Sequence, residues 1–107
     1  MSDKTENMAQ IYEVTAIVDP ARTAEFETYM SDEHIPDVLA TGCFAAAFFA
    51  KEGNQYTTAY HVNTPEDLQR YLDKHTAKLR DDFVQRFGDS VQTSRRVLDI
   101  VKLFPGQ

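Results

Sequence analysis

The sequence predicts an α+β fold in which four antiparallel strands are covered by two helices on one face. Segments rich in β-branched and aromatic residues alternate with segments whose apolar residues recur at helical spacing. Their order is β-α-β-β-α-β, and proline or glycine stands near most of the boundaries. This order is that of the ferredoxin-like split βαβ unit.

The first strand and the first helix are predicted from the start of this pattern. Residues 11–18 are rich in β-branched side chains, which favour a strand. Asp19 and Pro20 then supply an N-cap and a proline at the first helical position. We therefore expect a helix over residues 20–33.

Proline and glycine predict how this helix ends. Pro36 has no backbone N–H and its ring clashes with the preceding turn, so we expect it to stop or kink the helix. A short extra turn over residues 36–40 should follow. Gly42 is expected to end that turn as a left-handed cap.

The next two strands are predicted to form a hairpin. Residues 43–51 are almost wholly apolar, and residues 55–62 are rich in β-branched and aromatic side chains. The short segment between them contains Gly53, which suits a tight turn.

A second helix and a last strand complete the predicted domain. Thr64 as N-cap and Asp67 at the third helical position resemble a capping box, with Pro65 at the first position. Gly88 is expected to end the helix that begins there. Residues 92–104 are expected to form the last strand. The predicted organisation is a flexible leader over residues 1–9, a single domain over residues 10–104 and a tail over residues 105–107.

The predicted strands are apolar on both faces. In the second strand Ala47 and Phe49 alternate with Ala46 and Phe48, so both faces are apolar. The helices cover only one face, and the other face would be a large exposed apolar patch. We therefore expect a second copy of the same sheet to cover it, as an isologous homodimer.

Composition limits the classes of partner. The 107 residues are 42% hydrophobic and 26% charged, which indicates one soluble domain. The net charge of -6 argues against nucleic acid and against an anionic membrane surface. A single cysteine, Cys43, excludes an internal disulfide and a cysteine-based zinc site. The polar first residues contain no signal peptide, so we expect a cytoplasmic protein.

His34 is the strongest candidate for chemistry. A neutral imidazole takes or gives a proton near pH 7, and Glu33 or Asp37 would orient it. We predict His34 and Asp37 as catalytic residues. The structural alternative is that His34 caps the last carbonyls of the helix and that Asp37 is the N-cap of the following turn.

Aromatic and polar residues on the strands are predicted to bind a ligand. Tyr12, Tyr60 and His61, with Tyr56 beside them, would give apolar walls with a few polar groups, as a small aromatic ligand needs. The alternative is that the tyrosines only fill the sheet, with their hydroxyls at its rim.

Arg95 is a further ligand-binding candidate. Adjacent strand residues face opposite ways, so only one of Arg95 and Arg96 enters a given cavity, where it would hold a carboxylate. The alternative is a salt bridge, for which Asp99 is the expected partner. Arg80 is interpreted as part of a solvated face of the second helix.

No metal or cofactor site is predicted. The three histidines form no HxH or HxxxH pair, and no acid completes a facial triad at recognisable spacing. His75 falls on the apolar stripe of the second helix, where a core role is expected.

Residues 33–42, EHIPDVLATG, resemble the signature of a small bacterial family known only as a domain of unknown function. The likeness extends to residues 67–72, 75–80 and 86–88 and covers roughly residues 10–103. That family is similar to the dimeric α/β-barrel superfamily, so the resemblance implies a ferredoxin-like protomer that pairs sheet to sheet.

The resemblance also bears on function. The wider relatives include antibiotic-biosynthesis monooxygenases, muconolactone isomerase, polyketide cyclases and haem-degrading enzymes, which place a small apolar ligand between the sheet and the helices. It implies a small-molecule-binding protein, or a cofactor-free isomerase, cyclase or monooxygenase for a small apolar or aromatic metabolite. The alternative is a non-catalytic ligand carrier or a protein-interaction dimer.

Overall fold

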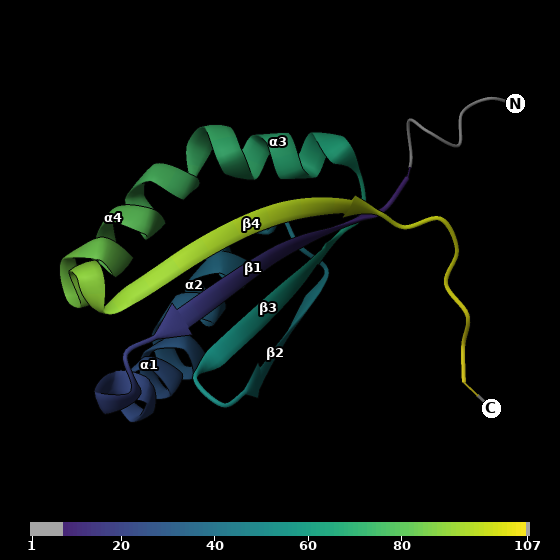
Figure 1. Ribbon diagram of the computed structural model, residues 1–107. Coiled ribbons are helices and arrows are strands. Elements are labelled where there is room, and N and C mark those ends of the chain that lie inside the picture. The colour runs from purple at the N-terminus through teal and green to yellow at the C-terminus, as the bar shows by residue number, and fades with distance from the viewer. Residues whose placement is uncertain (1–7, 107) are drawn as a thin grey trace, which may run out of the picture.

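The sheet has four antiparallel strands in the order β2-β3-β1-β4, which confirms the predicted ferredoxin-like topology. The computed structural model describes residues 8–106. The strands are β1 (Gln10–Val18), β2 (Ala46–Glu52), β3 (Gln55–Val62) and β4 (Val91–Asp99). All the helices of the described chain lie on one face of this curved sheet (Figure 1). The predicted leader lies mostly outside the described residues.

The first helical segment continues further than predicted. A 3-10 turn (Pro20–Arg22) leads into α1 (Thr23–Tyr29), then a π turn (Met30–His34), then α2 (Ile35–Ala40). Asp19 caps the start, because its Oδ1 accepts a hydrogen bond from the N–H of Ala21 at 2.9 Å.

Pro36 does not end this segment, and a π turn precedes it. The N–H of Ile35 donates to the carbonyl of Met30, five residues earlier, as in a π turn. This wider turn accommodates the proline ring, which would clash with the carbonyl four residues back in an α-helix. Gly42, with φ at 78°, then reverses the chain in the left-handed conformation predicted for it.

The second helix is divided in two. It consists of α3 (Pro65–Lys74) and α4 (Thr76–Phe87), where a single helix was predicted. The break lies at His75, whose φ of -124° leaves the helical region. The carbonyl of Tyr71 still accepts the N–H of His75 at 2.9 Å, and the hydroxyl of Thr76 donates to the same carbonyl at 3.3 Å.

Two strands are shorter than predicted. β2 begins at Ala46 because Cys43 and Phe44 are buried in the core before the strand starts. β4 ends at Asp99, which pairs with Gln10 at the start of β1, so no strand among residues 8–106 lies beside the residues after position 100. The tail over residues 101–106 is therefore exposed.

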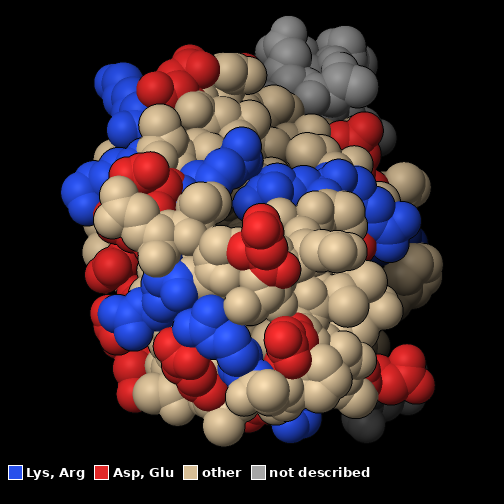
Figure 2. Space-filling model, turned by 60° about the vertical axis from the view of Figure 1, so that its left-hand side comes forward, with Lys and Arg blue, Asp and Glu red and all other residues tan. Residues whose placement is uncertain are grey.

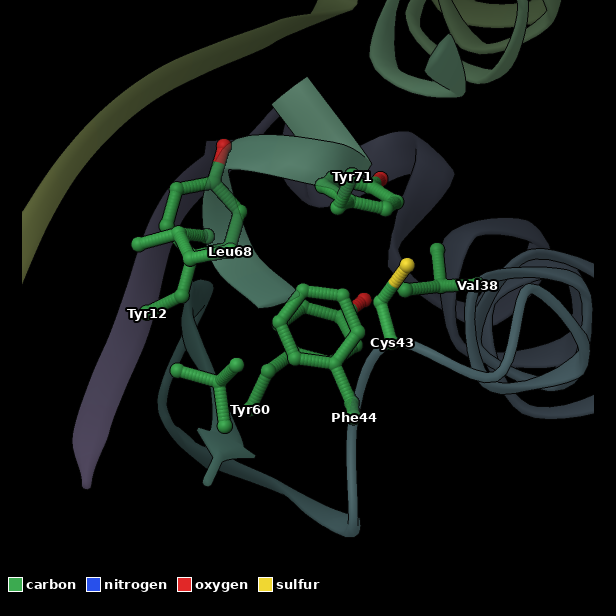
Figure 3. Close-up of a cluster of buried hydrophobic side chains, with 8 residues drawn as sticks. Tyr12, Val38, Cys43, Phe44, Tyr60, Leu68 and Tyr71 are labelled. Atoms are coloured by element: carbon green, nitrogen blue, oxygen red, sulfur yellow. The ribbon is translucent and has the colours of Figure 1, made fainter. Parts of the chain in front are cut away.

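Two buried clusters join the sheet to the helices. One lies under α2 and α3 and gathers the rings of Tyr12, Phe44, Tyr60 and Tyr71 (Figure 3). The other surrounds Phe26 of α1. Dense packing of aromatic rings across both clusters fixes the helices on the sheet. No helix among the described residues has the length and apolar character needed to cross a membrane.

Candidate functional site

A cavity of about 50 Å³ lies between the sheet and the helices, where the two clusters meet. Its apolar and aromatic lining is shared between the clusters: Tyr12, Tyr60 and Tyr71 from one, and Ala16, Phe26 and Met30 from the other. One water needs about 10–15 Å³ of such space, so the cavity has room for a few waters or part of one aromatic ring.

Polar groups also face this cavity. The polar residues that line it are Thr58, Thr76, Thr93, His34, Arg80 and Arg95. Among the described residues that line it, none carries a carboxylate. A mostly apolar wall with a few placed polar groups is typical of small-molecule sites.

The π turn ends at His34 and directs it toward this cavity. Its imidazole packs between the rings of Tyr29 and Phe83, with centroids 5.7 and 5.8 Å away. Its Nδ1 is buried and has no hydrogen-bond partner in the described part of the chain. A buried polar atom without a partner in a native fold calls for a functional or structural explanation.

The environment of His34 favours its neutral form. Burial lowers the pKa of this imidazole, since a charged ring would lose its hydration. The charge of Arg95 lowers the pKa further, while the charges of Asp37 and Asp82 oppose these effects in part. His34 is therefore mainly neutral near pH 7, which is the form of an imidazole that can accept a proton.

Neither predicted carboxylate orients His34. Asp37 is exposed in the first turn of α2 and influences the imidazole through charge alone. Glu33 instead lies 3.7 Å from Arg86. The structural alternative, in which His34 and Asp37 cap helix ends, is also not observed, because neither side chain makes a capping hydrogen bond.

Tyr12 and Tyr60 lie opposite each other on β1 and β3, with ring centroids 6.1 Å apart. Burial raises the pKa of the Tyr60 hydroxyl well above its usual value and that of Tyr71 to about 12, so both stay protonated donors. Figure 3 shows these three rings together in the cluster beside the cavity.

His61 and Tyr56 lie elsewhere. His61 pairs with Ile11 on the opposite face of the sheet, so it does not reach the cavity that Tyr60 lines. Tyr56 is on the helix face, but its hydroxyl donates to Glu27 Oε2 at 2.6 Å in the second cluster. The expected grouping of these residues with Tyr60 around one cavity is therefore wrong.

The two arginines of β4 point to opposite faces. Arg95 lines the cavity, and its Nη1 donates to Thr93 Oγ1 at 3.2 Å. Arg96 lies on the other face, where its Nε donates to Glu13 Oε1 at 2.7 Å. Asp99, the expected partner of an arginine here, accepts a hydrogen bond from Gln10 instead.

The sequence interpretation missed the contribution of α4. Arg80 lines the cavity, although it was assigned to a solvated face. Thr76, Arg80 and Phe83 occur at i, i+4 and i+7, which places them on one helix face. That spacing was the available signal. Within residues 8–106, no three His, Cys, Asp or Glu side chains lie close enough together to hold a metal ion.

Solved structures from several bacteria share this fold. A protein of unknown function from Nitrosomonas europaea is 11% identical, with a TM-score of 0.71 over 95% of this chain and 98% of that one. A monooxygenase from Streptomyces coelicolor, solved in complex with nanaomycin D, is 13% identical, with a TM-score of 0.72 over 94% of each chain. SnoaB, a cofactor-independent oxygenase from Streptomyces nogalater, is 14% identical, with a TM-score of 0.70 over 91% of this chain and 98% of that one.

At these identities the likeness shows the fold alone. No curated protein matches the chain in sequence. The sequence family described as "Domain of unknown function (DUF4286)" matches residues 9–101, nearly the whole of the described domain. The protein therefore belongs to the DUF4286 family and has the ferredoxin-like fold of these monooxygenase structures.

Proposed function

We propose that this cavity binds a small, mainly apolar aromatic molecule and that His34 takes a proton from it. The observation that carries the proposal is the buried Nδ1 of His34, which lacks a partner in the described chain while the ring lines the cavity. An imidazole held neutral near pH 7 is suited to general-base work.

The cavity walls support an aromatic ligand. Aromatic rings prefer tilted or edge contacts with one another, and Tyr12, Tyr60 and Tyr71 already pack in this way around the space. The phenol groups of Tyr60 and Tyr71 remain protonated, so they are suited to donate hydrogen bonds to a ligand oxygen. The small volume favours a ligand that buries no more than one ring there.

A proton transfer of this kind needs only groups of this chain and the ligand. The proton moves from an acidic C–H or O–H of the ligand to His34, and the charge left on the ligand is stabilised by Arg95. Isomerisation, cyclisation and oxygenation of aromatic metabolites can all begin with such a step. The similar structures of a cofactor-independent oxygenase and of a nanaomycin D complex support this class.

A non-catalytic ligand carrier is the second candidate. It is favoured by the position of Asp37, which is exposed and makes no hydrogen bond to His34. General bases are usually oriented by a third group, and none of the described carboxylates does this here. In a carrier the cavity would bind the same ligand without a change in its protonation.

We also propose a homodimer that forms through the free face of the sheet. Ile17, Phe48 and Leu98 lie on that face and are 47%, 65% and 37% exposed. Val101 and Phe104 follow it in the tail at 92% and 76%. Exposed apolar side chains of this kind are typical of an interface, and a second copy of the sheet would present the same side chains by symmetry.

Proton removal can be tested with 5-nitrobenzisoxazole. This probe loses one C–H proton to a base, its N–O bond breaks, and a coloured nitrile-phenolate forms with no other reactant. We expect the protein to accelerate this reaction and His34→Gln to slow it by about 10²-fold. His75→Gln, which removes an imidazole outside the cavity, is the matched control and should leave the rate unchanged.

The pH profile identifies the base. The rate should rise as His34 loses its proton, with a midpoint below the ordinary imidazole value of 6.5. If calorimetry shows that the probe binds but the protein and His34→Gln give equal rates, the result supports a ligand carrier and contradicts the general-base role of His34. An absence of binding would contradict both candidates.

A further inference from the structure

The arginines of this chain divide into two groups. Four of the six pair with carboxylates: Arg22 with Glu25 at 2.8 Å, Arg70 with Asp67 at 3.1 Å, Arg86 with Glu33 at 3.7 Å and Arg96 with Glu13 at 2.7 Å. Arg80 and Arg95 form no ion pair with a described residue, and both line the cavity. The chain carries 17 acidic residues, so a shortage of carboxylates does not explain why Arg80 and Arg95 form no ion pair.

These two guanidinium groups come from opposite walls. Arg95 belongs to β4 in the sheet layer, and its Nη1 is held by Thr93 at 3.2 Å. Arg80 belongs to α4 in the helix layer. Both charges act on the same phenol, because each lowers the pKa of Tyr71 against the larger effect of burial. Both side chains therefore lie near Tyr71 at the cavity.

The overall surface charge of the protein would not attract an anion to Arg80 and Arg95. Figure 2 brings the α4 and α1 end of the molecule forward and shows basic and acidic side chains interspersed over that face. A protein of net charge -6 repels anions at long range, so any preference for an anion must arise locally. Two arginines beside a cavity without a carboxylate supply such a local preference.

We propose that the ligand of this cavity is a small aromatic monocarboxylate, whose ring lies among the tyrosines and whose carboxylate binds Arg80 and Arg95. This inference rests on the proposed aromatic site and adds the charge of the ligand. A guanidinium group binds a carboxylate through two parallel N–H bonds, with a geometry that a neutral amide does not match. The carboxylate also anchors the ring at the mouth of the cavity, with its inner edge toward His34.

The test compares benzoate with benzamide, which have the same ring and nearly the same size but differ in charge. Calorimetry on the intact protein should show benzoate binding at least about 10-fold more tightly than benzamide. The preference should shrink as salt is raised, because both arginines are exposed at the mouth. Arg95→Gln and Arg80→Gln should each reduce the preference, and the double variant should bind both probes alike.

Two controls remove the same charge elsewhere. Arg96→Gln changes the neighbouring strand residue on the other sheet face, and Lys78→Gln changes an exposed residue of α4 that pairs with Asp82. Both should keep the benzoate preference. Equal affinity of the unaltered protein for the two probes would overturn the anionic ligand and leave the aromatic site standing. An absence of binding by either probe would overturn both.

Discussion

The backbone N–H of Ile35 donates to the carbonyl of Met30, five residues earlier, and this π turn determines where His34 points. The turn inserts one extra residue into a helix that would otherwise run from α1 into α2. Without it, the residues after Met30 would rotate by about 100° around the axis, as one residue of a 3.6-residue turn does. His34 faces the cavity because of this local irregularity.

Replacing Pro36 by alanine should therefore change the position of His34 in the site more than it changes the free energy of unfolding. Pro36→Ala restores an N–H that can form an ordinary α-helical bond, so the π turn loses its main cause. We expect the benzisoxazole rate to fall by at least about 10-fold while the free energy of unfolding changes by less than about 1 kcal/mol. Rate assays and urea unfolding measure the two effects.

Pro65→Ala is the control for this change. Pro65 occupies the first turn of α3, where a proline costs no helical hydrogen bond, so its replacement should not alter the rate. A Pro36→Ala protein with an unchanged rate would show that packing against Tyr29 and Phe83, and not the proline, positions His34.

Stability should depend on pH through His34. Its pKa is lowered in the folded state, so the unfolded chain binds a proton at a higher pH than the native protein does. The contribution of the neutral ring is complete above about pH 6.5 and is lost as the pH falls below that value. Between about pH 7.5 and pH 5, the unaltered protein should lose more stability in urea than His34→Gln.

Comparison with His34→Gln cancels most effects of the carboxylates. Asp37, Asp82 and Arg95, the charged groups that act on His34, remain in both proteins. An equal loss of stability in the two proteins would mean that the imidazole is as well solvated as in the unfolded chain. The pKa of His34 would then not be lowered by folding.

The sequence predicts this fold well because each element carries a local signal. Thr64 is a clear example, since its hydroxyl accepts the N–H of Asp67 at 3.1 Å, as the capping pattern predicts. Gly42 adopts the positive φ expected of a cap. The length of β4 was overestimated because three of the residues 101–104 are apolar, yet a strand also needs a partner.

The candidate site was only partly predictable, because its residues meet through tertiary packing. Period-two alternation places Tyr60 and His61 on opposite faces but does not say which face the helices cover. Arg80 was hidden by the charged residues next to it on α4. The π turn has no sequence rule beyond the proline itself, and a proline alone predicts equally an end or a kink.

Alkaline conditions should destabilise the protein through its buried tyrosines. Burial raises the pKa of Tyr60, and it raises that of Tyr71 to about 12, whereas an unfolded tyrosine titrates near 10. The unfolded state therefore loses protons first, and stability is complete below about pH 10 and falls as the pH rises above it. Urea unfolding at about pH 9 and pH 11 should show this loss.

Tyr60→Phe isolates one of these hydroxyls. Phenylalanine keeps the ring packed against Tyr12 but cannot ionise, so this variant should lose less stability than the unaltered protein over the same pH interval. The same loss in both proteins would show that the Tyr60 hydroxyl titrates like an exposed one. The cavity would then be open to water at that point.

Phe48 is the most direct test of the proposed dimer. It lies on β2, on the face of the sheet away from the helices, and is 65% exposed in one chain. Phe48→Lys places a charge at an exposed apolar position of the edge strand β2 that a second copy would bury, which costs several kcal/mol at a closed interface. We expect the unaltered protein to elute from gel filtration at twice its 12.2 kDa mass and Phe48→Lys to elute as a single chain.

Val84→Lys provides the matched control. Val84 is 54% exposed on α4, on the helical side of the molecule, so a lysine there should leave the dimer intact. Far-ultraviolet circular dichroism would verify that Phe48→Lys still folds, since an exposed lysine on an edge strand is well tolerated. If the unaltered protein elutes as one chain across micromolar concentrations, the sheet face has another occupant, and the two-faced strand pattern loses its explanation as a homodimer.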